Sequence, residues 1–152
     1  MDVLLDTNVW LRSVDLDDAL CATSVGAMQR LQDSGHTLVA VPQVFYEFWV
    51  VATRPVQNNG LGLSPSEARV EIVAIQKLCR FLKDERAVYT IWEQLVERHS
   101  VKGKPAHDAR LVAAMLRHSV GQLLTYNTTD FKRYSEIKAL SPIDILDGAD
   151  LV

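Results

Sequence analysis

Short apolar runs, each about the length of a buried strand, recur along the chain. They cover residues 3–5, 37–41 and 122–125, and runs at 87–89 and 137–140 are candidate strands as well. Runs of this length without polar alternation are typical of strands that are covered on both faces. The last run, 137–140, is predicted to lie at an edge of the sheet.

Between these runs, apolar residues repeat at the spacing of an α-helix. The predicted helices cover residues 19–32, 42–54, 64–83, 91–98 and 105–116. Pro42 and Pro105 suit the first turn of a helix, where a missing N–H costs nothing. Ser64 and Glu67 form a capping box. Strands that alternate with helices predict one α/β domain over residues 1–152, a three-layer α/β/α sandwich with a mainly parallel central sheet.

Acidic residues stand where several of these elements begin or end. Asp6 follows the first strand, and Asp130 lies in a turn after the strand at 122–125. Glu47 is in the second turn of its helix, and Asp108 is in the first turn of another. Sites in parallel sheets form beyond the carboxyl ends of the strands. We therefore expect these four carboxylates to gather at one edge of the sheet.

Carboxylate oxygens are hard ligands that suit Mg²⁺ or Mn²⁺, and a group of anions without a cation would repel itself. Divalent cations held in this way lower the pKa of a bound water and hydrolyse phosphodiester bonds without a side-chain nucleophile. The hydroxyl of Thr7 and the amide of Asn8 are predicted to hydrogen-bond the cluster. The sequence thus favours a metal-dependent nuclease.

Each acidic residue also has a purely structural interpretation. Asp6 and Asp130 can cap turns, Asp108 can stabilise the start of its helix, and Glu47 can face solvent. For any one residue this interpretation is the better one, and only the agreement of all four on one edge favours a metal site. Basic residues flank the acids and can contact RNA phosphates, although solvated charges explain them equally well. They are Arg12, Arg54, Lys102, Lys104 and Arg110.

Composition narrows the function classes. With 16 basic and 19 acidic residues the net charge is −3, so the chain lacks the positive field of a general nucleic-acid coat. The segment at 59–62, with Gly60 and Gly62, lacks both the Walker lysine and the dinucleotide glycine pattern, which argues against ATP and NAD binding.

Cys21 and Cys79 fall in helical patterns and are predicted to be buried thiols. The apolar start turns acidic too early for a signal peptide or membrane span, so a cytoplasmic location is expected.

Four motifs in order resemble those of the PIN-domain family, in particular the small ribonuclease toxins of the VapC type. The first contains Asp6-Thr7-Asn8, the second contains Glu47, and the third is His107-Asp108-Ala109. The fourth runs from Leu124 through Thr125, Asn127 and Asp130 to Phe131. Each motif is weak alone, but their order and spacing match over nearly the whole chain.

The resemblance implies Mg²⁺ or Mn²⁺, an RNA substrate, a homodimer and an antitoxin protein as partner. It implies Asp6, Glu47 and Asp108 as metal ligands, with Asp130 or Asn127 completing the site. Thr7, Asn8, Thr125 and Asn127 are the expected supporting residues. An amide in the fourth position would reduce the charge available to a second metal ion, so one metal or two remain alternatives.

Three functions are compatible with the sequence. An endoribonuclease accounts best for the ordered acidic residues. A PIN scaffold that only binds RNA or a protein accounts for the acidic net charge and for Asn127. Phosphoryl transfer through Asp6 is weaker, because Asp6-Thr7-Asn8 lacks the second aspartate of an Asp-x-Asp phosphatase.

Overall fold

The computed structural model describes residues 1–151, and the strands within them form one five-stranded sheet in the order β3-β2-β1-β4-β5. All neighbouring strands are parallel. The strands are Asp2–Leu5 (β1), Thr37–Ala40 (β2), Arg80–Phe81 (β3), Gln122–Leu124 (β4) and Lys138–Leu140 (β5). The predicted α/β fold with a mainly parallel sheet is confirmed, and β5 lies at an edge as expected.

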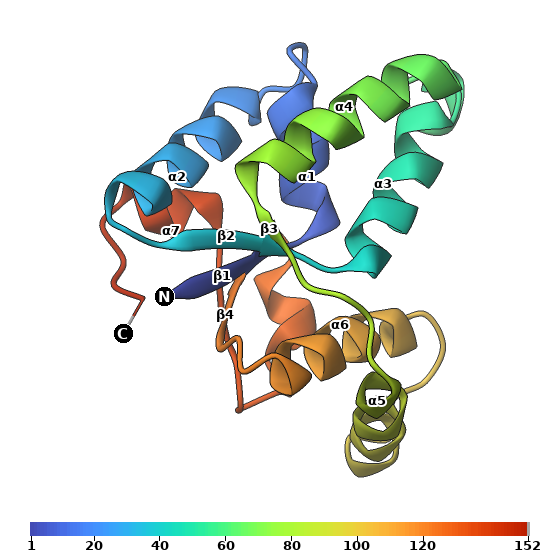
Figure 1. Cartoon of the computed structure of the whole chain (residues 1–152), viewed down its shortest axis with the longest axis vertical. Helices are drawn as coiled ribbons and strands as arrows, with labels where there is room; N and C mark the ends of the chain where they lie inside the picture. The colour runs from blue at the N-terminus through green and yellow to red at the C-terminus, as the bar shows by residue number, and fades with distance from the viewer. Residues whose placement is uncertain (152) are drawn as a thin grey trace.

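Helices cover the sheet on both sides. They are Thr7–Val14 (α1), Cys21–Asp33 (α2), Pro42–Thr53 (α3), Pro65–Leu78 (α4), Arg86–Arg98 (α5), Pro105–Arg117 (α6) and Pro142–Leu146 (α7). In Figure 1, helices α1 to α4 and α7 lie above strands β1 and β2, and α5 and α6 lie below them. This is the three-layer α/β/α arrangement that the alternating pattern predicts.

The sheet order brings distant segments to one edge. Strand β1 is central, and its Val3, Leu4 and Leu5 are at most 1% exposed, as a strand covered on both faces requires. Because β1 pairs with β4 in parallel, the residues after Leu5 and Leu124 leave the sheet side by side. The chain then enters helix α1 directly, so polar residues just after β1 open onto the edge where α3 and α6 begin.

Two predicted elements differ from the structure. The strand predicted at 87–89 is wrong, because these residues form the first turn of α5, where Val88 and Leu95 are buried seven residues apart on one face. Helix α4 ends at Leu78 rather than near Lys83. Beyond it the backbone is extended, and residues 80–81 form β3, which pairs with the outer edge of β2. If the helix continued to Lys83, the backbone groups on that edge of β2 would lose these hydrogen-bond partners.

Further differences concern segments to which the sequence interpretation assigned no helix. Residues 7–14 form α1 and residues 142–146 form α7, which begins with a capping box at Ser141. Cys79 lies between α4 and β3 and is only partly buried, whereas Cys21 is buried in α2 as predicted. No helix within residues 1–151 is long and apolar enough to cross a membrane.

Candidate active site

Asp6 lies at the point where β1 ends and α1 begins, and three groups donate hydrogen bonds to its carboxylate. The backbone N–H of Thr7 donates to Oδ1 at 2.7 Å. The hydroxyl of Thr125 donates to Oδ2 at 2.8 Å, and the amide Nδ2 of Asn8 is 3.2 Å from the same oxygen. Thr125 directly follows β4, so the parallel pairing of β1 and β4 is what brings this donor to Asp6. The carboxylate is therefore fixed in place by the sheet and by the start of α1.

Burial is the largest influence on the pKa of Asp6. The pKa of its carboxyl is raised above the ordinary 3.8 chiefly by burial, with further contributions from the negative charges of Glu47 and Asp130. The hydrogen bonds from Thr125 and Thr7 act in the opposite direction, because they stabilise the ionised form.

Glu47 reaches the same region from α3. The hydroxyl of Thr7 donates to its Oε2 at 2.9 Å, so Thr7 connects Asp6 with Glu47 through its backbone and side chain. The amide of Gln43, one helical turn earlier, donates to Glu47 Oε1 at 2.9 Å and to the carbonyl oxygen of His107 at 2.8 Å. Gln43 is only 7% exposed. It therefore holds Glu47 in position and ties α3 to the start of α6.

Asp108 approaches from α6 and is held differently. It is half-buried in the first turn of that helix, and no side chain of residues 1–151 donates a hydrogen bond to it. Burial, together with the charges of Asp6, Asp130 and Glu47, raises the pKa of its carboxyl to about 6, and the charge of His107 acts in the opposite direction. Three of the other acids thus act electrostatically on Asp108, which places all four in one electrostatic neighbourhood.

The fourth position separates into two residues with different surroundings. Asn127 is exposed and lines the same pocket as the other three. Asp130 lies in a 3₁₀ turn, Thr128–Phe131, is exposed, and is not among the residues that line this pocket. Its charge nevertheless raises the pKa of both Asp6 and Asp108.

A pocket of about 710 Å³ opens where these elements meet. The carboxylates of Asp6, Glu47 and Asp108 line it together, and its walls come from α1, α3, α6 and the segment after β4. Its other lining residues are Thr7, Asn8, Leu11, Gln43, Tyr46, Val50, Val51, His107, Arg110 and Asn127. One wall is thus acidic, and the wall from Leu11, Tyr46 and Val50 is apolar.

The donor set suits a hard divalent cation. Neighbouring negative charges add to the raised pKa of Asp6 and of Asp108, and a cation beside these carboxylates would offset that effect. Mg²⁺ keeps several waters and needs only one or two protein carboxylates. In the described part of the chain, no three His, Cys, Asp or Glu side chains lie close enough together to hold one ion. A cation that needs only one or two carboxylates is therefore the kind that fits. Asp6, Glu47 and Asp108 line the pocket together, so a cation here would be held directly by one or two of them and reach the others through its bound waters.

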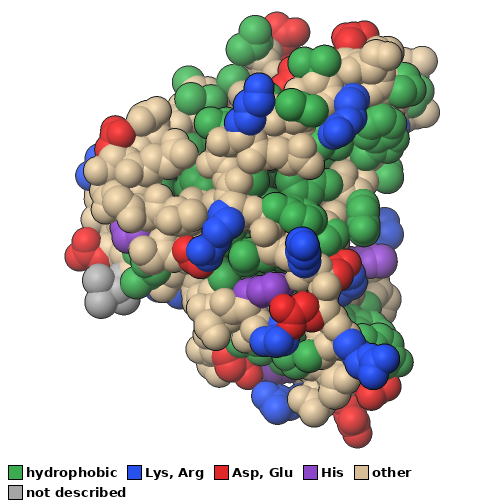
Figure 2. All heavy atoms as spheres, viewed as in Figure 1, with side chains coloured by type: hydrophobic (Ala, Val, Ile, Leu, Met, Phe, Trp, Pro, Cys, Tyr) green, Lys and Arg blue, Asp and Glu red, His purple; other side chains and the backbone are tan. Residues whose placement is uncertain are grey.

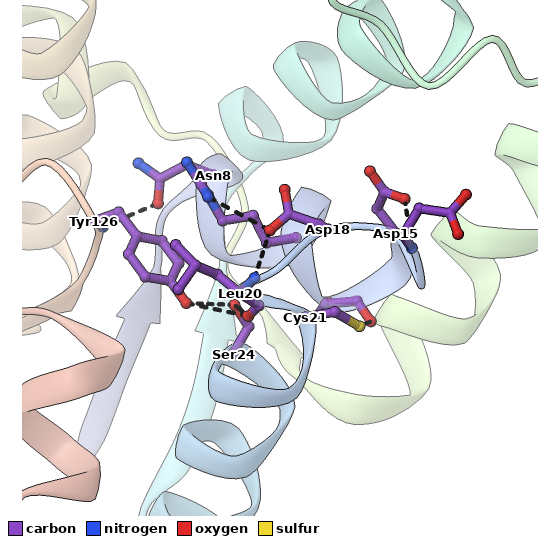
Figure 3. A network of polar contacts seen from close by, with 10 residues as sticks. Asn8, Asp15, Asp18, Leu20, Cys21, Ser24 and Tyr126 are labelled. Atoms are coloured by element: carbon purple, nitrogen blue, oxygen red, sulfur yellow. Dashed lines mark hydrogen bonds and ion pairs between the residues drawn. The ribbon is translucent and has the colours of Figure 1, made fainter. Parts of the chain in front are cut away.

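A polar network that includes Tyr126 and Ser24 fixes the side chain of Asn8 (Figure 3). Asn8 Oδ1 accepts a hydrogen bond from the backbone N–H of Tyr126 at 3.1 Å, while its amide group donates to Asp6 and Thr125. The Tyr126 hydroxyl lies 2.7 Å from Ser24 Oγ. Helix α2 therefore supports the orientation of Asn8, and with it the hydrogen bonds at Asp6.

The arginines near the acids divide into two kinds. Arg110 lines the pocket, donates to Gln43 Oε1 at 3.1 Å and pairs with Asp84 at 3.1 Å. Arg12 instead pairs with Asp18 at 3.5 Å and lies over the ring of Tyr126, and it is not among the lining residues, nor is Arg54. Of the candidate phosphate contacts near the acids, Arg110 is thus the one that faces the pocket.

Gln43 is the main site residue that the sequence interpretation missed. A glutamine in a helix has no distinctive pattern, but it stands four residues before Glu47 and so shares its face. That spacing next to a candidate ligand was the available signal.

A family model for the PIN domain matches residues 3–146. The chain belongs to the PIN domain family. The match spans β1 to α7 and includes every carboxylate described above. The predicted family resemblance is therefore confirmed.

Solved structures similar to this PIN domain include three bacterial examples. VapBC2 from Rickettsia felis, bound to a promoter DNA fragment, is 12% identical over 93% of this chain and 98% of that chain, with a TM-score of 0.69. VapC20 from Mycobacterium tuberculosis, described as a sarcin-ricin loop cleaving toxin, is 17% identical over 87% and 95%, with a TM-score of 0.59. A toxin–antitoxin complex from Klebsiella pneumoniae is 18% identical over 92% and 97%, with a TM-score of 0.60.

At these identities the similarity shows a common fold, and this PIN domain spans nearly the full length of each neighbour. No curated protein matches the chain.

Proposed function

We propose that this PIN domain is an endoribonuclease that hydrolyses RNA phosphodiester bonds with Mg²⁺ or Mn²⁺, acting in the cytoplasm as the toxin of a toxin–antitoxin pair. The observation that supports it is the convergence of Asp6, Glu47 and Asp108 on one pocket with Arg110 at its margin. VapC20, which shares the fold, is described as cleaving the sarcin-ricin loop.

The residues have distinct parts in this proposal. A divalent cation, when bound, supplies a water of lowered pKa and neutralises charge on the leaving oxygen. Asp6, Glu47 and Asp108 would hold the cation, directly or through its bound waters, with Asp130 or Asn127 as the fourth group, and Thr7, Asn8, Thr125 and Asn127 would support them. Arg110 is placed to meet a substrate phosphate, because it lines the pocket beside the acids.

The test is cleavage of a labelled single-stranded RNA by purified protein that carries no antitoxin. With Mg²⁺ or Mn²⁺ the native chain is expected to cut the RNA, and EDTA is expected to stop it. Asp6→Asn and Glu47→Gln are expected to reduce the cleavage rate at least about 100-fold. Loss of a residue that supports a metal ligand costs up to about 100-fold, and loss of the ligand itself is expected to cost more. Asp17→Asn is the matched control, since Asp17 is exposed and lies outside the pocket.

Two results would contradict the proposal: absence of cleavage with either metal, or cleavage that Asp6→Asn leaves unchanged. Cleavage of DNA of the same sequence at an equal rate would contradict the RNA assignment alone.

An antitoxin protein and a second copy of the chain are the proposed partners. The Klebsiella pneumoniae neighbour is a toxin–antitoxin complex. In this chain the apolar wall formed by Leu11, Tyr46 and Val50 adjoins the carboxylates, so a protein segment bound there would cover the acids. Light scattering of the purified chain tests the homodimer, and co-purification with the product of the adjacent reading frame tests the antitoxin.

A binding module without catalysis is the second candidate. It is favoured by the separation of the acidic side chains, of which no three in residues 1–151 lie close enough to hold one ion, and by the amide Asn127 in the pocket. RNA binding that EDTA leaves unchanged, without turnover, would support it. Cleavage lost in Glu47→Gln would exclude it.

A further inference from the structure

A second pocket, of about 850 Å³, lies beside the first, between the start of α5 and the start of α6. His107 and Arg110 line both pockets, so the two are adjacent and meet at these side chains. Its size falls within the range of about 300–1,000 Å³ that holds small organic groups. A chain that crosses the carboxylates and passes His107 therefore enters this second pocket.

Two aromatic rings form one side of the second pocket. Tyr89 and Trp92 have ring centroids 5.8 Å apart and planes inclined at 35°. The indole N–H of Trp92 donates to the carbonyl oxygen of Ala106 at 2.8 Å, which fixes the Trp92 ring against the start of α6. Tyr89 rests beside this fixed ring with 62% of its surface exposed. An exposed tyrosine ring, held by a rigid neighbour, is a surface on which a flat ring can stack.

The charges around the second pocket suit a polyanion. Its two acids already have cationic partners, since Asp84 pairs with Arg110 and Glu85 pairs with Arg117. Arg86 lines the pocket and makes no ion pair with any residue in 1–151. Figure 2 shows Lys and Arg side chains interspersed with hydrophobic and acidic ones at this end of the molecule, where α5 lies. A base on Tyr89 would thus have Arg86 available for its phosphate.

We propose that the second pocket is a nucleobase subsite, in which Tyr89 stacks against an unpaired base of the RNA and Arg86 contacts the adjoining phosphate, beside the bond held at the carboxylates. The inference rests on the proposed ribonuclease function. It adds that the substrate is single-stranded at this position, because a base paired within a helix has no free face for Tyr89. Arg110, bonded to Gln43, joins the subsite to Glu47.

Equilibrium binding of a fluorescein-labelled single-stranded RNA, in the full chain carrying Glu47→Gln to prevent cleavage, tests the subsite. Adding Tyr89→Ala is expected to weaken binding roughly 5- to 100-fold, the range for loss of one base–aromatic stack. Tyr89→Phe keeps the ring and is expected to stay within about threefold. Gln94→Ala, exposed on the same helix and outside both pockets, is the control and is expected to bind like the parent.

Arg86→Ala tests the phosphate contact. It is expected to reduce the slope of log affinity against log salt by about 0.7, the value for one phosphate of a single strand. An unchanged slope would remove Arg86 from the subsite.

Oligonucleotides with a single abasic residue, moved one position at a time, distinguish stacking from a general loss of structure. With Tyr89 present, one position is expected to weaken binding, and in Tyr89→Ala that same position is expected to have no further effect. Independent losses that add would overturn the stacking assignment. So would equal affinity for single-stranded RNA and for a blunt duplex of the same sequence.

Cleavage of the same RNA separates this inference from the proposed function. Tyr89-dependent binding without cleavage by the native chain would retain the subsite and reject the nuclease. Cleavage whose KM is unchanged by Tyr89→Ala would retain the nuclease and reject the subsite. Absence of RNA binding would overturn the subsite. So would a Tyr89→Ala variant whose RNA affinity is unchanged but whose oligomer has a different molecular mass, because that result would assign the pocket to a protein interface.

Discussion

The two sides of the active-site pocket hold their carboxylates in different ways. On the side built from β1 and α3, Asp6 accepts three hydrogen bonds and Glu47 accepts two. On the side built from α6, Asp108 is half-buried, and no side chain in the described residues donates to it. The first side is organised by the protein alone, and the second has no such support.

The pKa of both carboxyls is raised, but the influences that oppose the rise differ. Burial raises the pKa of both Asp6 and Asp108, and hydrogen bonds from Thr125 and Thr7 oppose this at Asp6. At Asp108 the opposing contribution is the charge of His107, and the pKa reaches about 6. The comparison teaches that the β1 side is preorganised by hydrogen bonds and the α6 side is not, and that on both sides a cation would offset the cost of ionising the carboxyl.

The largest expected effect is loss of cleavage in Asp108→Asn. Although Asp108 lacks hydrogen-bonded support, its ionised oxygen is proposed to bind the cation directly, so the rate is expected to fall at least about 100-fold. Initial rates of RNA cleavage at saturating Mn²⁺ measure it, with Asp17→Asn as the control. A rate within about threefold of the native chain would show that the α6 side is not part of the catalytic site.

A smaller loss is expected when the support of the β1 side is removed. Thr125→Val keeps the shape of the side chain but removes the hydroxyl that donates to Asp6, and residues that support metal ligands contribute about 10- to 100-fold to affinity or activity. Gln43→Leu removes the donor to Glu47 and is expected to fall in the same range. Manganese titration followed by cleavage rate separates weaker metal binding from a slower chemical step.

Thr125→Ser provides the rescue for this prediction, because it restores the hydroxyl. If Thr125→Val and Thr125→Ser cleave at the same rate, the organisation of Asp6 does not depend on this hydrogen bond.

The contrast between the two sides also shows which positions a sequence pattern can locate. Asp6 is the first polar residue after a buried apolar run, and Asp108 follows a proline that starts a helix, so one-dimensional patterns locate both. The strand order, by contrast, is a property of the whole sheet. This order places Thr125 beside Asp6. No local pattern in either segment predicts the strand order.

Contacts between helices were harder still to foresee. Gln43 bonds both Glu47 and Arg110, and it does so because α3 and α6 meet at the sheet edge. The strand wrongly predicted at 87–89 hid another feature, since Tyr89 and Trp92 lie together only when both belong to α5. Short apolar segments are ambiguous between strand and helix, and tertiary packing decides between them.

A pH effect of about tenfold per unit is expected on the acid side of the cleavage profile. Asp108 must lose its proton to bind a cation, and its pKa is raised to about 6, so below that value the ionised fraction falls about tenfold for each pH unit. Initial rates from pH 4.5 to 8 at low, fixed Mn²⁺ measure the effect. Higher Mn²⁺ is expected to move the midpoint to lower pH, because the cation competes with the proton. A midpoint that is independent of Mn²⁺ would contradict metal binding by Asp108.

The smallest expected effect is a gain in stability of the metal-free protein in Asp108→Asn. The folded-state pKa of about 6 lies above the ordinary 3.8, so the folded chain binds this proton more tightly than the unfolded chain. The carboxyl therefore costs no stability below about pH 3.8, and its cost grows as the pH rises through about 6. For a half-exposed group, solvent screening reduces this cost to about 1 kcal/mol, or a rise in Tm of about 2–4 °C in Asp108→Asn.

Thermal unfolding in EDTA at pH 7.5 and pH 4 measures this gain, which is expected at pH 7.5 and absent at pH 4. The same substitution on the β1 side, Asp6→Asn, is expected to lower Tm at pH 7.5. There Thr125, Thr7 and Asn8 all donate hydrogen bonds to the carboxylate. In Asp6→Asn an NH₂ group replaces one of the accepting oxygens, so a donor faces a donor and a hydrogen bond is lost. Opposite signs for the two variants would establish that one side is organised without the cation and the other is not. Equal signs would remove the distinction between them.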